Sequence, residues 1–392
     1  MKKSYKYRLY PNRDQKILIN KTIGSCRWIY NWGLEKTIKE YNENKKRFSR
    51  IDLQKEITIL KKQTETEWLK EIHTNALRDS LLCLEKSFQY FFNGKTKFPR
   101  FKSKYGKKSY AFPIGMKTDF RNQKFYVPSV GWIKTIFDRE YEGKMRKATV
   151  SVTPSGKYFI SILVEDKHEP PQTTQIKSET SIGIDTGIKN FLVLSNGIVV
   201  DNPQYLRRSL DRIRILSKRF SKKQDGSKNK NKARIRLAKA YEKVANQRMD
   251  YIHKVTHELT KGENQADSIF IEDLNIQGML ANRRLALSLH DSSLGIFYKT
   301  LEYKCRWNGI NLIKIGRFEP SSKLCTCGIK NDELKLSDRS WTCKHCGATH
   351  DRDLLAAQNI KRIGLEKYSG GGTPGEPVEV STLVEPLKQE KF

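Results

Sequence analysis

Three short stretches decide how the C-terminal half of this chain is expected to fold, and each carries an acid at the edge of an apolar run. They are Ile182–Asn190 (IGIDTGIKN), Ile269–Asn275 (IFIEDLN) and His350–Ile360 (HDRDLLAAQNI). The apolar residues before Asp185 and before Glu272 predict two strands that end at these acids. If the two strands pair, both carboxylates meet at the same edge of a sheet.

The third acid, Asp353, begins a predicted helix, whose positive end favours a negative charge. Hydrolysis of a phosphodiester by two divalent metals needs acids that converge on one point, and Asp and Glu oxygens suit Mg²⁺ or Mn²⁺. Each acid alone is more typical of a loop residue or a cap, but Asp185, Glu272 and Asp353 together are far more specific. We expect their carboxylates within roughly 4–8 Å of one another, and the neighbouring Asp351 ranks below Asp353.

Apolar periodicity predicts strands and helices in a recognisable order around these acids. The expected strands are Ser181–Asp185, Phe191–Ser195, Ile198–Val200, Ser268–Glu272 and Asn311–Ile315. The expected helices are Ser293–Asn308 and Asp353–Ile363, with very basic helical sequence between the third and fourth strands. This order is typical of a ribonuclease-H-like α/β fold.

The sequence of the N-terminal half predicts a different order of strands and helices. A strand over Lys3–Tyr10 ends at Pro11, after which Asn12 is expected to cap a helix. The expected helices are Gln15–Tyr41, Ile51–Lys61 and Glu67–Phe92, and the expected hairpin is Ala148–Glu165. Residues 167–180 are a plausible linker, and a Gly-, Pro- and Glu-rich tail from Gly364 is expected to be disordered.

The composition indicates a polyanionic partner. The 392 residues include 75 Lys and Arg against 43 Asp and Glu, which gives a formal net charge of +32. Nucleic acid is the expected partner of so basic a chain. No apolar run approaches the roughly 18 residues that a membrane-spanning helix needs, and the polar start predicts no signal peptide. We therefore expect no membrane association and a cytoplasmic location.

A cysteine cluster between the second and third acids predicts a zinc site. Its members are Cys325, Cys327, Cys343 and Cys346. Two close pairs separated by fifteen residues have the spacing of a zinc ribbon, and Gly328 and Gly347 allow each knuckle to turn tightly. His345 and His350 are possible substitute ligands. The alternative is four free thiols, while a disulfide framework is disfavoured by the odd total of seven cysteines.

Two basic stretches are the candidate nucleic-acid surfaces. Arg207–Arg248 holds 16 Lys and Arg but three acids, more positive charge than solubility requires. Gly94–Lys108 mixes seven Lys and Arg with Phe98, Phe101 and Tyr105, which suits stacking on RNA or a single strand, although the two Phe may instead anchor the loop to a core. The residues expected to contact nucleic acid are Arg27, Asn31, Lys97, Arg100, Lys102, Arg207, Arg208, Arg212, Lys218, Arg219, Lys222, Lys223, Arg234 and Arg248.

Several motifs together resemble one protein family. IGIDTGIKNFLVLSNG, FIEDLNIQGM, EPSSKLCTCG, WTCKHCGATHDRD and AAQNI, with YKYRLYPNRDQ near the start, resemble the TnpB (OrfB) family of transposon-encoded, RNA-guided nucleases, relatives of the type V CRISPR effectors. The resemblance runs from about residue 3 to about residue 363. The chain departs from the family at Leu355, where Asn is usual, and in the first cysteine pair, which lacks one residue between its ligands.

The resemblance implies a multi-domain protein of α/β and α+β class. It implies a ribonuclease-H-like (RuvC) nuclease domain over residues 181–363 with a zinc-binding insertion at 319–350. It also implies a wedge-like β-domain, residues 1–12 plus 94–175, that encloses a helical recognition domain at 13–93. The family's catalytic acids correspond to Asp185, Glu272 and Asp353.

The function implied by the resemblance is that of an RNA-guided, Mg²⁺- or Mn²⁺-dependent DNA endonuclease encoded by an insertion sequence. Its partners would be a guide RNA and target DNA, cut next to a short motif, and base pairing with the guide would carry the sequence specificity. The alternatives are a nuclease-impaired, RNA-guided DNA-binding repressor and a transposase-type protein that joins DNA ends. The oligomeric state is left open.

Overall fold

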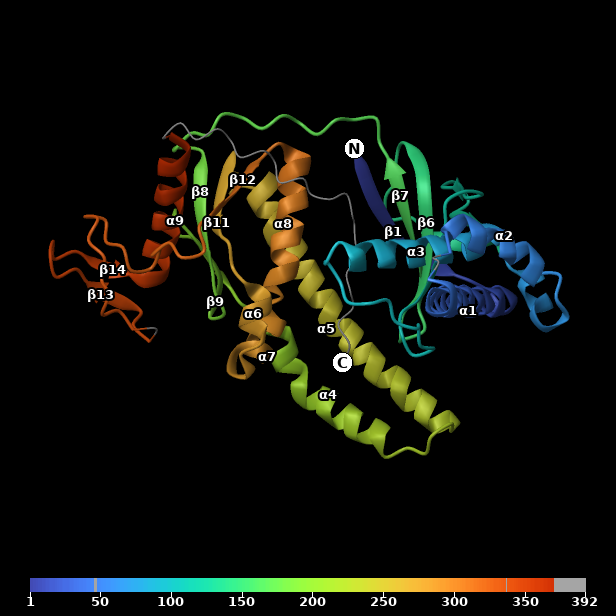
Figure 1. Ribbon diagram of the computed structural model, residues 1–392. Coiled ribbons are helices and arrows are strands. Elements are labelled where there is room, and N and C mark those ends of the chain that lie inside the picture. Colours follow the sequence, from blue (N-terminus) through green and yellow to red (C-terminus); the bar gives the residue numbers. More distant parts are fainter. Residues whose placement is uncertain (46–47, 336, 370–392) are drawn as a thin grey trace. The chain divides into compact units, whose positions relative to one another are not determined.

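The computed structural model describes residues 1–45, 48–335 and 337–369 (Figure 1). The chain forms two compact units, the first of residues Met1–Glu169 and the second beginning at Pro170. Each has its own sheet and hydrophobic core. Within the described residues, no helix is both long and apolar enough to cross a membrane.

The first unit is built on a seven-stranded antiparallel sheet. Its strands are β1 (Lys2–Tyr10), β2 (Lys108–Phe112), β3 (Lys117–Asp119), β4 (Lys124–Val127), β5 (Gly131–Ile136), β6 (Lys144–Val152) and β7 (Tyr158–Glu165), in the order β2-β6-β7-β1-β5-β4-β3. Alternating residues of β1 and β7, among them Tyr7, Leu9, Ile160 and Ile162, are buried on one face. The predicted hairpin is confirmed, since Val152 on β6 pairs with Tyr158 on β7.

Four helices accompany this sheet. They are α1 (Arg13–Asn44), α2 (Arg50–Leu60), the 3-10 helix η1 (Thr64–Glu71) and α3 (Thr74–Phe92). The predicted cap at Asn12 is confirmed, because its side chain accepts a hydrogen bond from the backbone N–H of Gln15. The prediction of one helix over residues 67–92 is wrong: His73 is extended and caps α3 by accepting from the N–H of Asn75, which interrupts the helix before Thr74.

The second unit has a five-stranded sheet whose elements follow the predicted order. Its strands are β8 (Ser181–Thr186), β9 (Asn190–Leu194), β10 (Val199–Asp201), β11 (Ser268–Glu272) and β12 (Asn311–Ile315), in the order β10-β9-β8-β11-β12. The three strands β8, β11 and β12 run parallel, whereas β9 and β10 pair antiparallel. All five expected strands are confirmed to within one or two residues.

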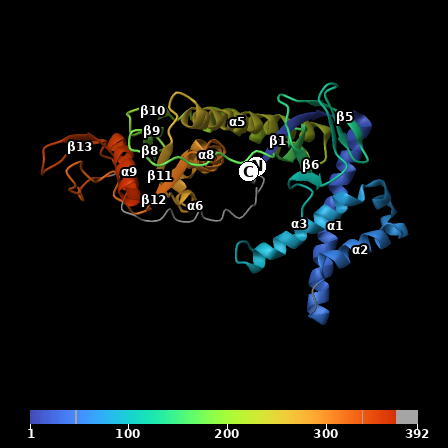
Figure 2. The ribbon, with the colours of Figure 1, turned by 90° about the horizontal axis from the view of Figure 1, so that it is seen from above.

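Helices cover both faces of this sheet, as Figures 1 and 2 show. Helix α9 (Arg352–Ser369) lies on one face, and α5 (Lys228–Lys261) and α8 (Leu294–Asn308) lie on the other. The approach of α9 requires glycine at position 183, because a Cβ there would lie 2.1 Å from the carbonyl oxygen of Ala357. Helix α9 continues to Ser369, so residues 364–369 are helical rather than part of the expected tail, and residues 370–392 lie outside the described residues.

The remaining elements of the second unit extend from this core. The basic stretch forms a hairpin of α4 (Tyr205–Ser221) and α5, which pack through Leu206, Ile213 and Val244. Two short helices, α6 (Ile276–Leu280) and α7 (Arg283–Ser292), follow β11. The cysteine-rich segment lies between β12 and α9 and contains a two-stranded sheet of β13 (Ser340–Thr342) and β14 (Thr349–Asp351).

Candidate functional site

The three candidate acids come from three elements that pack together. Asp185 lies near the end of β8, and Glu272 is the last residue of β11. Ile184 and Ile271 are register partners on these parallel strands, so the acids that follow them lie side by side. Helix α9 packs on β8 and carries Asp353 in its first turn. The adjacent acid, Asp351, caps α9 by accepting a hydrogen bond from the N–H of Leu354 at 2.9 Å.

The charges of Glu272 and Asp353 both act on Asp185. Burial, and after it the negative charges of Glu272 and Asp353, raise the pKa of Asp185 to about 7 against the opposing effects of the Thr186 backbone and Arg352. Neighbouring carboxylates have this effect only at short range. A divalent cation bound among them would relieve the mutual repulsion, so the donor set fits a hard metal such as Mg²⁺ or Mn²⁺.

Each of the other two acids has a protein partner. The hydroxyl of Ser321 donates a hydrogen bond to Glu272 Oε1 at 2.6 Å, and Arg339 Nη1 lies 3.5 Å from Asp353 Oδ1. Tyr298 shares a hydrogen bond of 3.0 Å with Thr186, and burial raises its pKa, with Glu272 and Asp185 adding to the shift. Sequence reasoning missed these partners. The one local signal was for Ser321, which stands in EPSSKLCTCG, four residues before the first cysteine of the cluster.

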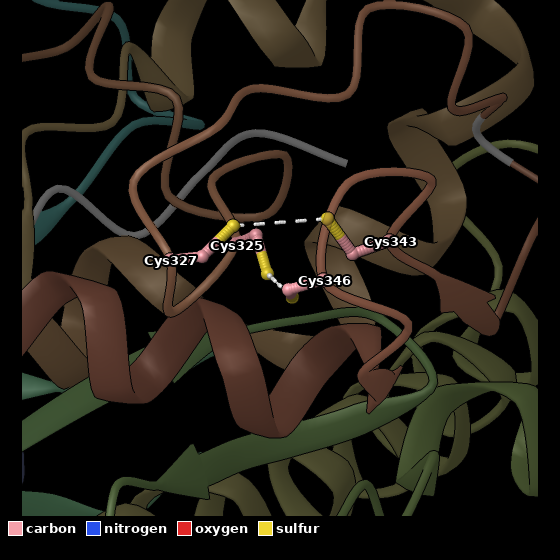
Figure 3. Close-up of side chains that lie close together, drawn as sticks. All are labelled: Cys325, Cys327, Cys343 and Cys346. Atoms are coloured by element: carbon pink, nitrogen blue, oxygen red, sulfur yellow. Dashed lines mark hydrogen bonds between the residues drawn. The ribbon is translucent and has the colours of Figure 1, made fainter.

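The four cysteines form a compact set of ligands (Figure 3). Their sulfur atoms all lie within 4.8 Å of one another, with Cys325 and Cys346 at 3.5 Å and Cys327 and Cys343 at 3.8 Å. Tetrahedral zinc with Zn–S bonds of about 2.3 Å separates its sulfurs by about 3.8 Å, so the arrangement fits zinc. Among the described histidine, cysteine and acidic side chains, this is the one group already gathered as a metal-binding set.

The knuckles adopt the turns expected from their glycines. Gly328 and Gly347 have φ angles of +87° and +73°, and their N–H groups donate to the carbonyls of Cys325 and Cys343. Of the two candidate substitute ligands, His345 is exposed, whereas His350 Nε2 lies 3.1 Å from Cys325 Sγ. Although burial opposes the shift, hydrogen bonds from the Cys327 backbone and from His350 lower the pKa of the Cys325 thiol to about 5.

Leu355, which stands where the family usually has Asn, belongs to the core of the cysteine-rich segment. It is buried in a cluster with Cys325, Cys343, Leu334 and Trp341. It lies on α9 one turn or less from Asp353 and therefore ties the segment to the helix that carries the third acid. Apolar packing thus accommodates leucine in place of the family's usual asparagine at this position.

Most of the candidate nucleic-acid contacts in the second unit are exposed on the α4–α5 hairpin. These are Arg207, Arg208, Arg212, Lys218, Arg219, Lys222, Lys223 and Arg234. Arg248 differs, since its side chain is 14% exposed and its Nε lies 3.5 Å from Asp291 Oδ1. Asp291 also accepts hydrogen bonds from the N–H groups of Leu206 and Arg207 at the start of α4. This pair gives the half-buried Arg248 a partner within the fold, which favours a structural role, and its role as a nucleic-acid contact stays a prediction.

The candidate nucleic-acid contacts in the first unit also differ in exposure and in their contacts within the fold. Arg27 is half-buried on α1, and Lys97 and Arg100 are exposed. Asn31 is engaged internally, because its amide donates to the carbonyl of Lys102 at 3.0 Å and accepts from the N–H of Lys102 at 2.7 Å. That pair anchors the loop on α1, and the nucleic-acid contact expected of Asn31 stays a prediction.

The aromatic and cationic side chains of the same loop also pack against the helices. Lys102 Nζ lies 3.8 Å from the centre of the Tyr30 ring. Phe98 packs edge-on against Phe88 and Phe91, which agrees with the alternative that this side chain anchors the loop. Phe101 is 56% exposed. Phe98 therefore packs on α3 while it is itself 45% exposed, and Phe101 is also accessible.

Three family models match parts of the chain. A family model described as "Probable transposase" (OrfB_IS605) matches residues 160–283, a Cas12f1-like TNB domain model matches 295–360, and a helix-turn-helix model of the same OrfB family matches 1–46. The TNB match contains all four cysteines and Asp353. In the structure, the described part of this range forms β1 and the single long helix α1.

Similar proteins extend over nearly the whole chain. A "Putative RNA-guided DNA endonuclease" from Streptomyces pristinaespiralis is 35% identical over 95% of this chain and 91% of its own. The "Putative RNA-guided DNA endonuclease InsQ" from Escherichia coli (strain K12) is 27% identical over 99% of this chain and 96% of its own. A Cas12f1 structure solved with sgRNA and target DNA shares the fold, with a TM-score of 0.54 at 14% identity, over 92% of this chain and 98% of that one.

The fold and the site define a multi-domain, mixed α/β protein with an acid cluster beside a cysteine-rich TNB domain. The chain belongs to the TnpB (OrfB) family of transposon-encoded, RNA-guided nucleases.

Proposed function

We propose that this protein is an RNA-guided, metal-dependent DNA endonuclease of an insertion sequence, with a RuvC-type nuclease site at Asp185, Glu272 and Asp353. The observation that carries the proposal is the placement of the acids: Asp185 and Glu272 follow the register partners Ile184 and Ile271 on paired strands, and Asp353 lies in the first turn of α9, which packs on β8. A buried carboxylate with a raised pKa, such as Asp185, is typical of functional sites. The names of the relatives and the fold shared with Cas12f1 support the same activity.

The chain's own groups would hold and orient the reacting phosphate and the metals. Two Mg²⁺ or Mn²⁺ ions held by the three carboxylates would activate a water and stabilise the leaving oxygen. Asp353 is supported at the positive end of α9. Arg339, next to Asp353, is 54% exposed and can supply positive charge close to a bound phosphate.

The domain arrangement is part of the proposal. We assign the RuvC-like nuclease domain to residues 181–363 with a zinc-binding insertion at 319–350, the wedge-like β-domain to 1–12 plus 94–175, and the helical recognition domain to 13–93. The β10-β9-β8-β11-β12 sheet with helices on both faces supports the first assignment. The seven-stranded sheet and α1 to α3 support the other two.

The cofactors and partners follow from the same features. Cys325, Cys327, Cys343 and Cys346 would hold a structural zinc ion, because their sulfurs already have near-tetrahedral spacing. The exposed cations of the α4–α5 hairpin would contact the backbones of the guide RNA and the target DNA. A cytoplasmic location is proposed with this function, since the protein must reach both the guide RNA and the target DNA.

A plasmid assay tests the function. The protein is purified with the RNA it retains, that RNA is sequenced to identify the guide, and a supercoiled target library with randomised flanking bases is added with Mg²⁺. Linearised plasmid that depends on the guide and on one flanking motif supports the proposal. Tight binding without cutting would instead indicate a repressor, and joining of DNA ends without a guide would indicate a transposase.

A further inference from the structure

A serine outside the acid cluster holds one of its members. Ser321 lies in the segment that leads from β12 to the first cysteine pair, and its hydroxyl donates to Glu272 Oε1 at 2.6 Å. The serine is 6% exposed, so water competes little for this hydrogen bond. Glu272 ends β11 beside Asp185, and the repulsion between these two carboxylates would otherwise turn the flexible side chain of Glu272 away.

The backbone of Ser321 is itself fixed from both sides. Its N–H donates to the carbonyl of Glu319 at 2.8 Å, and its carbonyl accepts from Asn359 Nδ2 at 2.7 Å. Asn359, on α9, is 2% exposed and donates a second hydrogen bond to the carbonyl of Leu324 at 2.6 Å. The hydroxyl therefore projects from a rigid support that is anchored on the same helix as Asp353.

We propose that Ser321 is a positioning residue of the nuclease site, which orients the Glu272 carboxylate for divalent metal. This inference rests on the proposed function. A carboxylate oxygen has lone pairs to spare, so accepting one hydrogen bond leaves Glu272 able to bind an ion. Carboxylate ligands of metal sites are commonly held by such hydrogen bonds, and removing the partner typically costs about 10- to 100-fold in metal affinity.

The competing interpretation is that Ser321 only closes the loop before the cysteine pair. Substitution separates the two, because Ser321→Ala removes the hydroxyl while both backbone hydrogen bonds of residue 321 remain available. Ser321→Thr keeps a hydroxyl and serves as the rescue variant. The neighbouring Ser322→Ala is the matched control, since this half-buried serine shows no hydrogen bond to the acid cluster.

The experiment measures Mn²⁺ binding by electron paramagnetic resonance on the full chain freed of RNA, with Asp185→Ala defining binding outside the acid cluster. We expect Ser321→Ala to weaken the Asp185-dependent binding by about 10- to 100-fold, and Ser321→Thr and Ser322→Ala to bind like wild type. The Mg²⁺ concentration for half-maximal plasmid cutting should rise in the same variant, with its zinc content unchanged.

Three outcomes overturn the inference. Equal Mn²⁺ affinity in Ser321→Ala and wild type shows that the hydroxyl does not position Glu272, while the proposed nuclease function stands. If Ser321→Thr and Ser321→Ala weaken Mn²⁺ binding equally, the packing of the loop around residue 321, and not the hydroxyl, determines the metal affinity. Identical binding in wild type and Asp185→Ala removes the metal site itself, and with it both the proposed function and the role of Ser321.

Discussion

Ile184 on β8 and Ile271 on β11 are register partners in parallel strands, and this pairing sets the chemistry of the site. The residues that follow them, Asp185 and Glu272, consequently lie side by side at one sheet edge. A slip of one residue in this register would turn one carboxylate to the opposite face of the sheet. The buried isoleucines on both strands prevent the slip, since both have 0% exposure.

Replacing Asp185 should separate cutting from binding. We expect Asp185→Ala to abolish guide-dependent plasmid cutting and to leave the affinity for guide and target nearly unchanged, because affinity comes from phosphate contacts with cations elsewhere. Cutting is followed on gels and binding by mobility shift at a fixed salt concentration. Cutting by the variant at the wild-type rate would reject the assignment of Asp185.

The raised pKa of Asp185 predicts a pH-dependent stability when no divalent ion is added. Its pKa of about 7 in the folded protein lies above the unfolded value of about 3.9, so the fold favours the protonated acid. The contribution is fully present below pH 4 or so and is lost as the pH rises through about 7. Urea unfolding at pH 5 and pH 8 should show a decrease for wild type that is smaller in Asp185→Asn. An equal decrease in both proteins would contradict the shift.

The zinc site predicts a simple stoichiometry. Metal analysis of the purified protein should find about one zinc per chain, because Cys₄ sites close around a single ion. Cys343→Ser should lose that zinc and melt at a lower temperature, since the ion would join the two cysteine pairs. Cys305→Ser, at a buried cysteine outside the cluster, is the control and should retain the metal. Full zinc retention in Cys343→Ser would remove the site.

Two arginines of the basic stretch should behave in opposite ways. Arg248→Ala leaves Asp291 buried without its cation, so we expect a loss of roughly 1–3 kcal/mol of folding stability. Arg212→Ala, at an exposed position, should leave the folding stability unchanged and weaken nucleic-acid binding. The slope of the logarithm of the binding constant against the logarithm of the salt concentration (the salt slope) should fall in magnitude by about one. Urea unfolding and salt-dependent binding titrations measure both. A change of salt slope in Arg248→Ala without loss of stability would identify Arg248 as a nucleic-acid contact.

Restoring the family's usual Asn at position 355 should not improve the enzyme. Leu355→Asn would bury an amide among Trp341, Leu334 and two cysteines, at a cost of about 2–4 kcal/mol. We expect lower thermal stability and zinc that is removed more readily by a chelator. Leu355→Met, which conserves volume, is the control and should cost less than about 1.5 kcal/mol. Equal stability of Leu355→Asn and wild type would contradict the packing role.

The sequence by itself determined the elements whose signals are local. The apolar runs before Asp185 and Glu272 predicted β8 and β11, because alternation and length are properties of a few adjacent residues. The cysteine spacing predicted the gathered ligand set for a similar reason, since each knuckle spans a few residues. The continuous helix expected over residues 67–92 is interrupted where His73 caps α3. The local sequence is compatible both with a continuous helix and with a cap at this position, and tertiary packing decides between them.

Only the tertiary structure decided which partner each polar side chain has. Ser321 and Glu272 are 49 residues apart, Asn31 and Lys102 are 71 apart, and Arg248 pairs with an aspartate on another helix. Such pairs form because strands and helices distant in sequence pack together, and no periodicity in the chain records which side chains then meet. The physical reason is that burial removes water, so each polar group must bind whatever partner the fold brings within reach.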